Sequence, residues 1–507
     1  MSARDVASRL RRPTWLDSRH DPQPRPARTS RPLSPRVRLM LALIVLATIA
    51  RAVVWIGVLP AWQGPDEGAH YAYVERLANW SYPNVGDPTD HPSTAMATSW
   101  GHTAFGEFWH HTTNRPLTPA LRRALPPEPP NLSQDAPGAL YESTYPPLYY
   151  AILVPFYRLP GLDTATSRLY AVRFGSALLG GLLVLITFFL VRELVRDDVL
   201  ALAGAALVGL PPIISQASAI CNPDIGLAVA GTALALASLR AAIHGFTWRR
   251  LVAVGLLAVA TAEMKVFGPP AAAVIAAPLL ILPVLARRTR HMLAAGLAFT
   301  AAAAVGLFAV SLHHSGELSA PHLRFSATYL WQFYLPRLPF MGAVFPAGSP
   351  FSKPVPAVWI WGQLGVGDFG WISAPIAIGY VKLAGITAAV ASVAAGVGLV
   401  VRRHSLPREE LVLIGSCAVA VVLFVLALNA AEAATMLPAQ GNAAAFYGRL
   451  LQGRYLIPAV PLAVAAVLAG LRAWSRNVAL AGAALLLATW FVISIAGLDT
   501  ILRFYGT

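Results

Sequence analysis

The chain has few charged residues: they make up 12% of its 507 residues, whereas soluble globular proteins carry about 25%. Hydrophobic residues make up 56%, and many of them lie in long apolar runs. This balance excludes an ordinary soluble globular domain and indicates a chain whose main solvent is lipid. We therefore expect an all-α polytopic membrane protein, with one transmembrane bundle and loops outside the membrane.

Cysteine is also scarce, with only Cys221 in a predicted loop and Cys417 within an apolar run. These positions argue against a disulfide, and neither residue belongs to a cluster with metal-binding spacing. Although the net charge is +15, no basic stripe lies on a soluble segment. Arg instead clusters beside apolar runs, which is typical of membrane insertion. We therefore expect no nucleic-acid partner.

The first 36 residues contain nine Arg and many Pro, so we expect residues 1–36 to form a disordered basic arm. The apolar run 37–59 that follows is longer than the apolar region of a cleaved signal peptide. We expect a retained first helix, with the arm in the cytoplasm. The bundle would extend over 37–498, and 499–507 would form a short outer tail.

Eleven apolar runs approach the length of about 20 residues that a transmembrane helix needs. They are 37–59, 168–191, 198–214, 224–243, 251–267, 269–286, 291–312, 374–401, 410–430, 454–473 and 477–498. Arg-rich loops stay on the cytoplasmic side, so the Arg clusters between these runs set their orientation. Two large loops, 60–167 and 313–373, then lie outside. We expect the shorter run 147–159 to lie in the outer interface; a twelfth span is the alternative.

The strongest candidate for chemistry is the segment 63–71 (QGPDEGAHY), directly after the first predicted helix. Pro65 suits the first position of a helix, and acidic residues suit the first turn. Asp66 and Glu67 share a helix face with His70, which lies four and three residues further on. The simpler explanation is an ordinary helix start at the membrane surface. The three side chains also offer acid–base chemistry, or ligands for a divalent cation, which prefers carboxylates.

Three further polar sites lie at predicted helix ends. They are Asp224 in the segment CNPD, Lys265 in EMK, and Arg454 with Tyr455 in QGRYLIP. Ordinary capping explains the Asp, and snorkelling of its long side chain to the membrane surface explains the Lys. However, the predicted orientation places all of them outside with Asp66, and Arg suits forked contacts with phosphate. This arrangement favours a reaction on a lipid-linked phosphate, with carboxylates for the acceptor and cations for the phosphate.

Four histidines of the first outer loop could in principle bind metal or sugar: His91, His102, His110 and His111. Their spacing matches no compact ligand motif. We therefore expect them to be solvated loop residues.

In their order, these features resemble the GT-C superfamily of membrane glycosyltransferases, which includes protein O-mannosyltransferases and the aminoarabinose transferase of lipid A. The shared pattern is Asp66-Glu67 after the first helix, 146–150 (PPLYY), and Asp224 before the fourth helix. The chain more closely resembles a bacterial family of predicted membrane proteins, domain of unknown function 2142. The matching segments are 65–70 (PDEGAH), 369–371 (FGW) and 452–456 (QGRYL), and the resemblance covers about residues 40 to 475.

The resemblance implies a sugar donor linked to polyprenyl phosphate and a general base in the first outer loop. Asp66 matches that base, with Glu67 as the alternate, and Lys265 and Arg454 match positions near the lipid phosphate. His70, Asp224 and Tyr455 would help to bind the substrates. The implied reaction is an inverting hexosyl or pentosyl transfer to an envelope glycan, lipid or protein at the bacterial plasma membrane. Because the chain ends nine residues after the run 477–498, we expect the outer loops to recognise the acceptor.

A transporter or flippase is the alternative function. Such proteins usually carry charged groups or broken helices at mid-membrane, and many have repeated halves. Here most helix interiors are uncharged and the polar groups gather at one face, which favours the enzyme. A non-catalytic membrane scaffold is the third hypothesis.

Overall fold

The computed structural model describes residues 32–81, 92–103, 105, 124, 126–129, 141–286, 320–345, 356–370, 373–436 and 452–505. The chain divides into two units, Met1–Ser34 and Pro35–Thr507, and every element below belongs to the second unit. Strands among the residues described are limited to β1 (Asp368–Phe369), which pairs antiparallel with β2 (Ala374–Pro375). All other elements are helices, so the predicted all-α architecture is confirmed.

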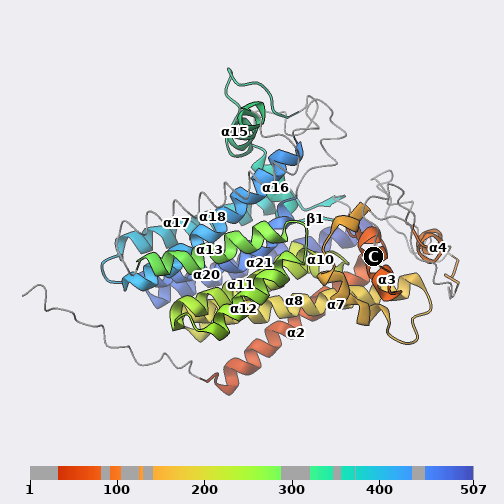
Figure 1. Ribbon diagram of the computed structural model, residues 1–507, viewed down its shortest axis with the longest axis horizontal. Helices are drawn as coiled ribbons and strands as arrows, with labels where there is room; N and C mark the ends of the chain where they lie inside the picture. Colours follow the sequence, from red (N-terminus) through yellow and green to blue (C-terminus); the bar gives the residue numbers. More distant parts are fainter. Residues whose placement is uncertain are drawn as a thin grey trace, which may run out of the picture. The chain divides into compact units, whose positions relative to one another are not determined.

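Within the described residues, eight helical segments are long and apolar enough to cross a membrane. They are α2 (Pro35–Val58), α8 (Ala165–Val195), α11 (Asp224–His244), α13 (Gly268–Ala286), α17 (Ile378–Val401), α18 (Arg408–Met436), η5 with α20 (Gly453–Ala459 and Val460–Trp474), and α21 (Arg476–Tyr505). A ninth span results if α9 (Asp198–Gly209) and α10 (Pro212–Ala219), bent by 66°, count as one. The protein is thus a multi-pass membrane protein (Figure 1).

These segments correspond to nine of the eleven predicted spans. The run 251–267 forms α12 (Trp248–Ala262), whose 15 residues are fewer than a full span needs. The run 291–312 lies outside the described residues, so the count of eleven stays a prediction. The run 147–159 forms α7 (Leu148–Tyr157), a helix of 10 residues with a proline inside it. Its place in the outer interface also stays a prediction.

The remaining described helices are short and fall in the two long loops. They are α3 (Glu67–Ala78), α4 (Thr94–His102), η2 (Tyr141–Thr144), α15 (Ala320–Tyr334) and α16 (Val358–Val366). Most of the predicted arm 1–36 lies outside the described residues, whereas residues 499–505 of the predicted tail continue α21.

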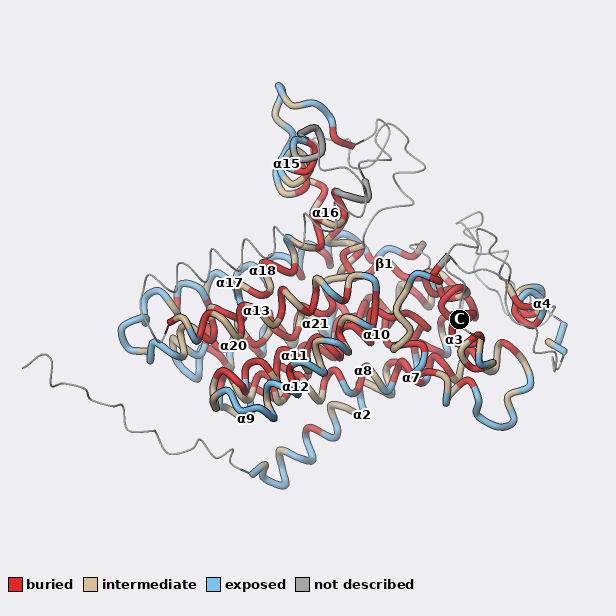
Figure 2. Tube along the Cα trace, in the orientation of Figure 1, coloured by how far each residue is buried: buried red, intermediate tan, exposed pale blue. Residues whose placement is uncertain are grey.

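Helix α11 lies at the centre of the bundle. In the most apolar 18-residue stretch of α11, 78% of the residues are buried inside the protein, compared with 22% in α2 and 17% in α17. It packs against α8, α12 and α13, and Figure 2 shows this contrast between buried and exposed helices. Because α11 begins at Asp224, this helix presents a carboxylate at its first turn, where the helix dipole favours negative charge.

Loops from distant parts of the sequence meet at this end of α11. The Leu148 backbone N–H donates to the Glu263 carbonyl at 3.2 Å, joining α7 to the α12–α13 turn. Gln216 Nε2 donates to the Gly370 carbonyl at 3.4 Å, joining α10 to the segment after β1. Figure 1 shows α3, α7 and α10 close together near the marked C-terminus. The candidate site is built from these loops.

Basic residues mark the opposite ends of the same helices. Arg240, near the end of α11, pairs with Glu193 near the end of α8. Arg476, at the start of α21, pairs with Asp197, which caps α9. The candidate site and the Arg-rich turns therefore lie at opposite ends of the bundle.

Candidate functional site

The acidic pair of the first loop adopts an unusual backbone conformation. Asp66 precedes α3 with φ = 58° and ψ = 14°, in the left-handed region that Asp and Asn visit more readily than bulkier residues. Glu67 is the first residue of α3. Asp66 is partly exposed, whereas Glu67 is fully buried. Adjacent carboxylates thus lie in different environments.

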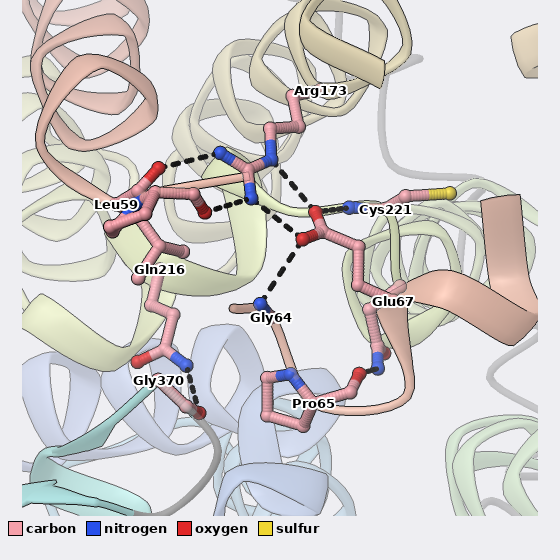
Figure 3. A network of polar contacts seen from close by, with 10 residues as sticks. Leu59, Gly64, Pro65, Glu67, Arg173, Gln216, Cys221 and Gly370 are labelled. Carbon is pink, nitrogen blue, oxygen red and sulfur yellow. Dashed lines mark hydrogen bonds and ion pairs between the residues drawn. The ribbon is translucent and has the colours of Figure 1, made fainter. Parts of the chain in front are cut away.

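Glu67 is held by a buried arginine that the sequence analysis did not select (Figure 3). Arg173, in α8, donates to both carboxylate oxygens, from Nε at 2.8 Å and from Nη2 at 2.6 Å. The same guanidinium donates to the carbonyls of Leu59 and Pro60 at 2.7 and 2.8 Å. Both charged side chains are fully buried, so each requires the other as a partner.

Two backbone N–H groups complete the shell around Glu67. Gly64 and Cys221 each donate to its carboxylate at 3.1 Å. The Cys221 bond ties the loop before α3 to the loop before α11. A Cβ on Gly64 would lie 2.9 Å from the Ile220 side chain, so only glycine fits this approach. Glu67 therefore fixes the shape of the loop that carries Asp66.

Arg454 joins Asp66 to the start of the central helix. Its Nη2 lies 3.9 Å from Oδ2 of Asp66, and its Nε lies 3.3 Å from Oδ2 of Asp224. The second contact is an ion pair without hydrogen-bond alignment, since Nε of Arg454 has no hydrogen-bond partner in the described structure. Arg454 is 4% exposed, so these charges interact with little screening by water.

Lys265 completes a buried cluster of charges. Its Nζ pairs with Oδ1 of Asp224 and lies 3.8 Å from the ring centroid of Tyr455. The Arg454 guanidinium lies 5.4 Å from the same ring. Asp224 therefore holds two cations side by side, and Tyr455 offers both a cation–π contact.

A hydrogen-bonded chain anchors the loop before Asp224. The Tyr149 hydroxyl accepts from the Asn222 backbone N–H at 2.8 Å and bonds to Ser176 Oγ at 2.9 Å. Asn222 uses its side-chain oxygen to accept from the Asp224 N–H, and its Nδ2 donates to the Pro65 carbonyl at 3.3 Å. The two acidic loops are thus bonded directly to each other.

His70 and Glu142 lie beside Asp66. One candidate ligand atom from each residue falls within 4.8 Å of the others. His70 Nδ1 is 2.9 Å from the Tyr150 hydroxyl. Burial, reinforced by Lys265 and Arg454, lowers the pKa of His70 well below its ordinary value. Burial, followed by the charge of Asp66, raises the pKa of Glu142 to about 8.

An apolar cavity of about 400 Å³ adjoins the cationic cluster. It lies among α9, α10, α16, α17, η5, α20 and α21. Gly453, Leu456 and Ile457, which surround Arg454 in η5, contribute to its lining. A hydrocarbon chain fits such a lining, and the lining helix η5 also carries Arg454.

The structure brings the predicted site residues to one end of the bundle. Asp66, His70, Asp224, Lys265, Arg454 and Tyr455 form one connected group, and Glu67 lies behind it in the ion pair with Arg173. Two further residues of the site, Arg173 and Glu142, were not predicted from the sequence. Of the four loop histidines, His102 ends α4 and contacts the Pro126 carbonyl, and the other three lie outside the described residues.

A comparison with protein families matches residues 145–315 to the family described as dolichyl-phosphate-mannose-protein mannosyltransferase. The match covers about a third of the chain and includes Arg173, Asp224 and Lys265. It supports a membrane glycosyltransferase of the GT-C type, the superfamily that the sequence resembles. The resemblance to domain of unknown function 2142 stays a prediction. Comparisons with curated proteins and with solved structures found no match.

Proposed function

We propose that the protein is an inverting glycosyltransferase that moves a sugar from a polyprenyl-phosphate donor to an acceptor hydroxyl on the outer face of the membrane. One observation carries this proposal: a partly exposed carboxylate, Asp66, lies 3.9 Å from a buried guanidinium, Arg454. A base for the acceptor and a cation for the donor phosphate are thus neighbours. The family match to residues 145–315 supports the same reaction class.

In the proposed reaction, the acceptor oxygen attacks the anomeric carbon as the bond from that carbon to the phosphate oxygen breaks. The bonding electrons leave with the phosphate, and the acceptor proton passes to Asp66. A base in this position contributes about 10²–10⁴-fold to the rate. Asp66 suits this role better than Glu67, because every side of the Glu67 carboxylate already meets a donor.

Arg454 and Lys265 are proposed to bind the donor phosphate. Both are nearly buried, and both are held by Asp224, so they are oriented before the substrate arrives. Preorganised charges of this kind stabilise negative charge that develops on a leaving group. The two cations share the Asp224 carboxylate, and both carry several N–H donors, so an anionic substrate can accept hydrogen bonds from both.

The apolar cavity is proposed to receive part of the isoprenoid chain of the donor. Leu456 and Ile457 line it, and Arg454 precedes them in the same short helix. A lipid bound there would carry its phosphate toward the cationic cluster. This continuity favours a lipid-linked donor over a soluble nucleotide sugar.

The outer face is proposed from the distribution of charge. Arg-rich turns lie at the opposite end of the bundle from Asp66, and such turns stay in the cytoplasm. The acceptor would then be an envelope glycan, lipid or protein.

Deletion and complementation test the proposal in the cell. Wild-type protein should restore an envelope glycan that the deletion strain lacks, and the polyprenyl-phosphate sugar should accumulate in cells that carry Asp66→Asn. Mass spectrometry of the envelope glycan and of the polyprenyl-phosphate sugar measures both effects. If lipid-linked sugar moves across proteoliposomes and no glycosylated product forms, the protein is a flippase and the proposal fails.

A further inference from the structure

Three side chains at the edge of the charged cluster have the composition of a metal site. His70, in α3, supplies an imidazole, and Asp66 and Glu142 supply carboxylates from the α3 start and from η2. One ligand-type atom of each lies within 4.8 Å of the other two. Atoms bound to a common ion at about 2.0–2.2 Å lie at most about 4.4 Å apart, so a small approach of these side chains brings all three to one ion.

The histidine is oriented as metal-bound histidines are. Tyr150 engages Nδ1 at 2.9 Å, and in the described structure Nε2 has no hydrogen-bond partner. A hydrogen bond to one ring nitrogen fixes the ring and leaves the other nitrogen for a ligand. Tyr150 is itself held by stacking on Tyr73, with ring centroids 4.0 Å apart. The aromatic packing therefore fixes the imidazole orientation.

Glu142 provides the second, independent indication. It is 4% exposed and hydrogen-bonded to Tyr145, and among the residues the structure describes it forms no ion pair. A buried carboxylate normally has a cationic partner, because its desolvation is otherwise unfavourable. The nearby cations, Lys265 and Arg454, are both engaged with Asp224.

We propose that Asp66, His70 and Glu142 bind one divalent first-row transition cation, of the Mn²⁺ or Zn²⁺ class. The mixed imidazole and carboxylate ligands suit this class better than Ca²⁺ or Mg²⁺, which prefer oxygen alone. Three protein ligands leave positions open for substrate oxygens. A carboxylate has two oxygens, so Asp66 can hold the cation through one and accept a proton at the other. This last role rests on the proposed function, whereas the binding of the cation does not.

Mn²⁺ binding to the purified full-length protein tests the site without donor or acceptor. The protein is stripped with a chelator and titrated with Mn²⁺, and free Mn²⁺ is counted by electron paramagnetic resonance. One tight equivalent per chain is expected, with nitrogen coupling from His70 that disappears in His70→Gln. Glu142→Gln should weaken binding about 10-fold or more. The matched control is Glu263→Gln, on an exposed glutamate near the same end, which should bind like the wild type.

Absence of a tight equivalent in the wild type overturns the proposal, and so does wild-type binding by a folded Glu142→Gln protein. The wild-type result stands even if a variant fails to fold. The titration uses Mn²⁺ without donor or acceptor. Absence of binding would therefore overturn the cation site and would not contradict the proposed sugar transfer. Conversely, if the protein binds Mn²⁺ but transfers no sugar, the cation site is supported and the proposed glycosyltransferase function is contradicted.

Discussion

Arg454 Nη2 lies 3.9 Å from Asp66 Oδ2, although the two residues come from opposite ends of the chain. Arg454 is buried beside Asp224, while Asp66 is partly exposed. The contact therefore places a preorganised cation next to a carboxylate that a substrate can reach. This pairing of base and phosphate-binding group is the basis of the proposed reaction.

Replacement of Arg454 tests the phosphate-binding role. Arg454→Gln removes the charge and should lower kcat by about 10²–10³-fold, the loss expected when a preorganised group at a developing charge is removed. Arg454→Lys keeps the charge and loses the forked geometry, so it should restore only part of the rate. Steady-state transfer assays with a polyprenyl-phosphate sugar measure both. Equal activity of Arg454→Gln and wild type would exclude the role.

The buried pair of Glu67 and Arg173 should govern stability. Glu67→Gln leaves a buried guanidinium with a neutral partner, and breaking such a pair destabilises a protein by about 3–5 kcal/mol. The variant should therefore show a clearly lower Tm in detergent than the wild type. Asp499→Asn is the matched control, since it breaks an exposed pair with Arg503 and should change stability by no more than about 1 kcal/mol. Similar Tm values for the two variants would contradict this assignment.

Gly453 should tolerate no side chain. A Cβ there would collide with the Trp361 carbonyl and lie 2.8 Å from the Gly365 nitrogen, because η5 packs directly on α16. Gly453→Ala should destabilise the protein by about 1–3 kcal/mol and displace Arg454. Gly255→Ala is the control, since a Cβ in that part of α12 meets nothing within 4 Å. Gly255→Ala should leave the stability unchanged or raise it by up to about 1 kcal/mol. Thermal unfolding of both variants measures the difference.

The raised pKa of Asp368 predicts that the stability of the protein depends on pH. Burial raises the pKa of this carboxyl in β1 from 3.8 to about 7. The folded state thus holds the proton more tightly than the unfolded state, so stability falls as pH rises from about 4 through 7. Asp368→Asn cannot ionise and should raise Tm at pH 8, with a much smaller effect at pH 4. An equal shift at both pH values would show that ionisation is not the cause.

Much of the charged cluster was predictable, because polar residues stand out in an apolar chain. Asp224, Lys265 and Arg454 interrupt long hydrophobic stretches, and the positions of Arg-rich turns place all three at one end. The all-α fold followed from the same runs. The pairing of Lys265 and Arg454 on one carboxylate was not visible, because it depends on contacts between distant helices.

The separate environments of Asp66 and Glu67 could not be read from the sequence. The left-handed backbone at Asp66 sends the two side chains apart, and it depends on the loop that Arg173 fixes from α8. Arg173 lies in an apolar run, where a single arginine resembles an ordinary interfacial residue. Glu142 lies in a loop with no helical or strand period to mark it. In both cases the missing information was a long-range contact.

Sugar transfer by the purified Asp66→Asn protein tests the central claim most directly. Asn adopts the left-handed conformation as readily as Asp, so this change removes the base and retains the backbone. We expect the variant to insert and unfold like the wild type and to transfer sugar about 10²–10⁴-fold more slowly. Wild-type transfer rates in a folded Asp66→Asn protein would contradict the account.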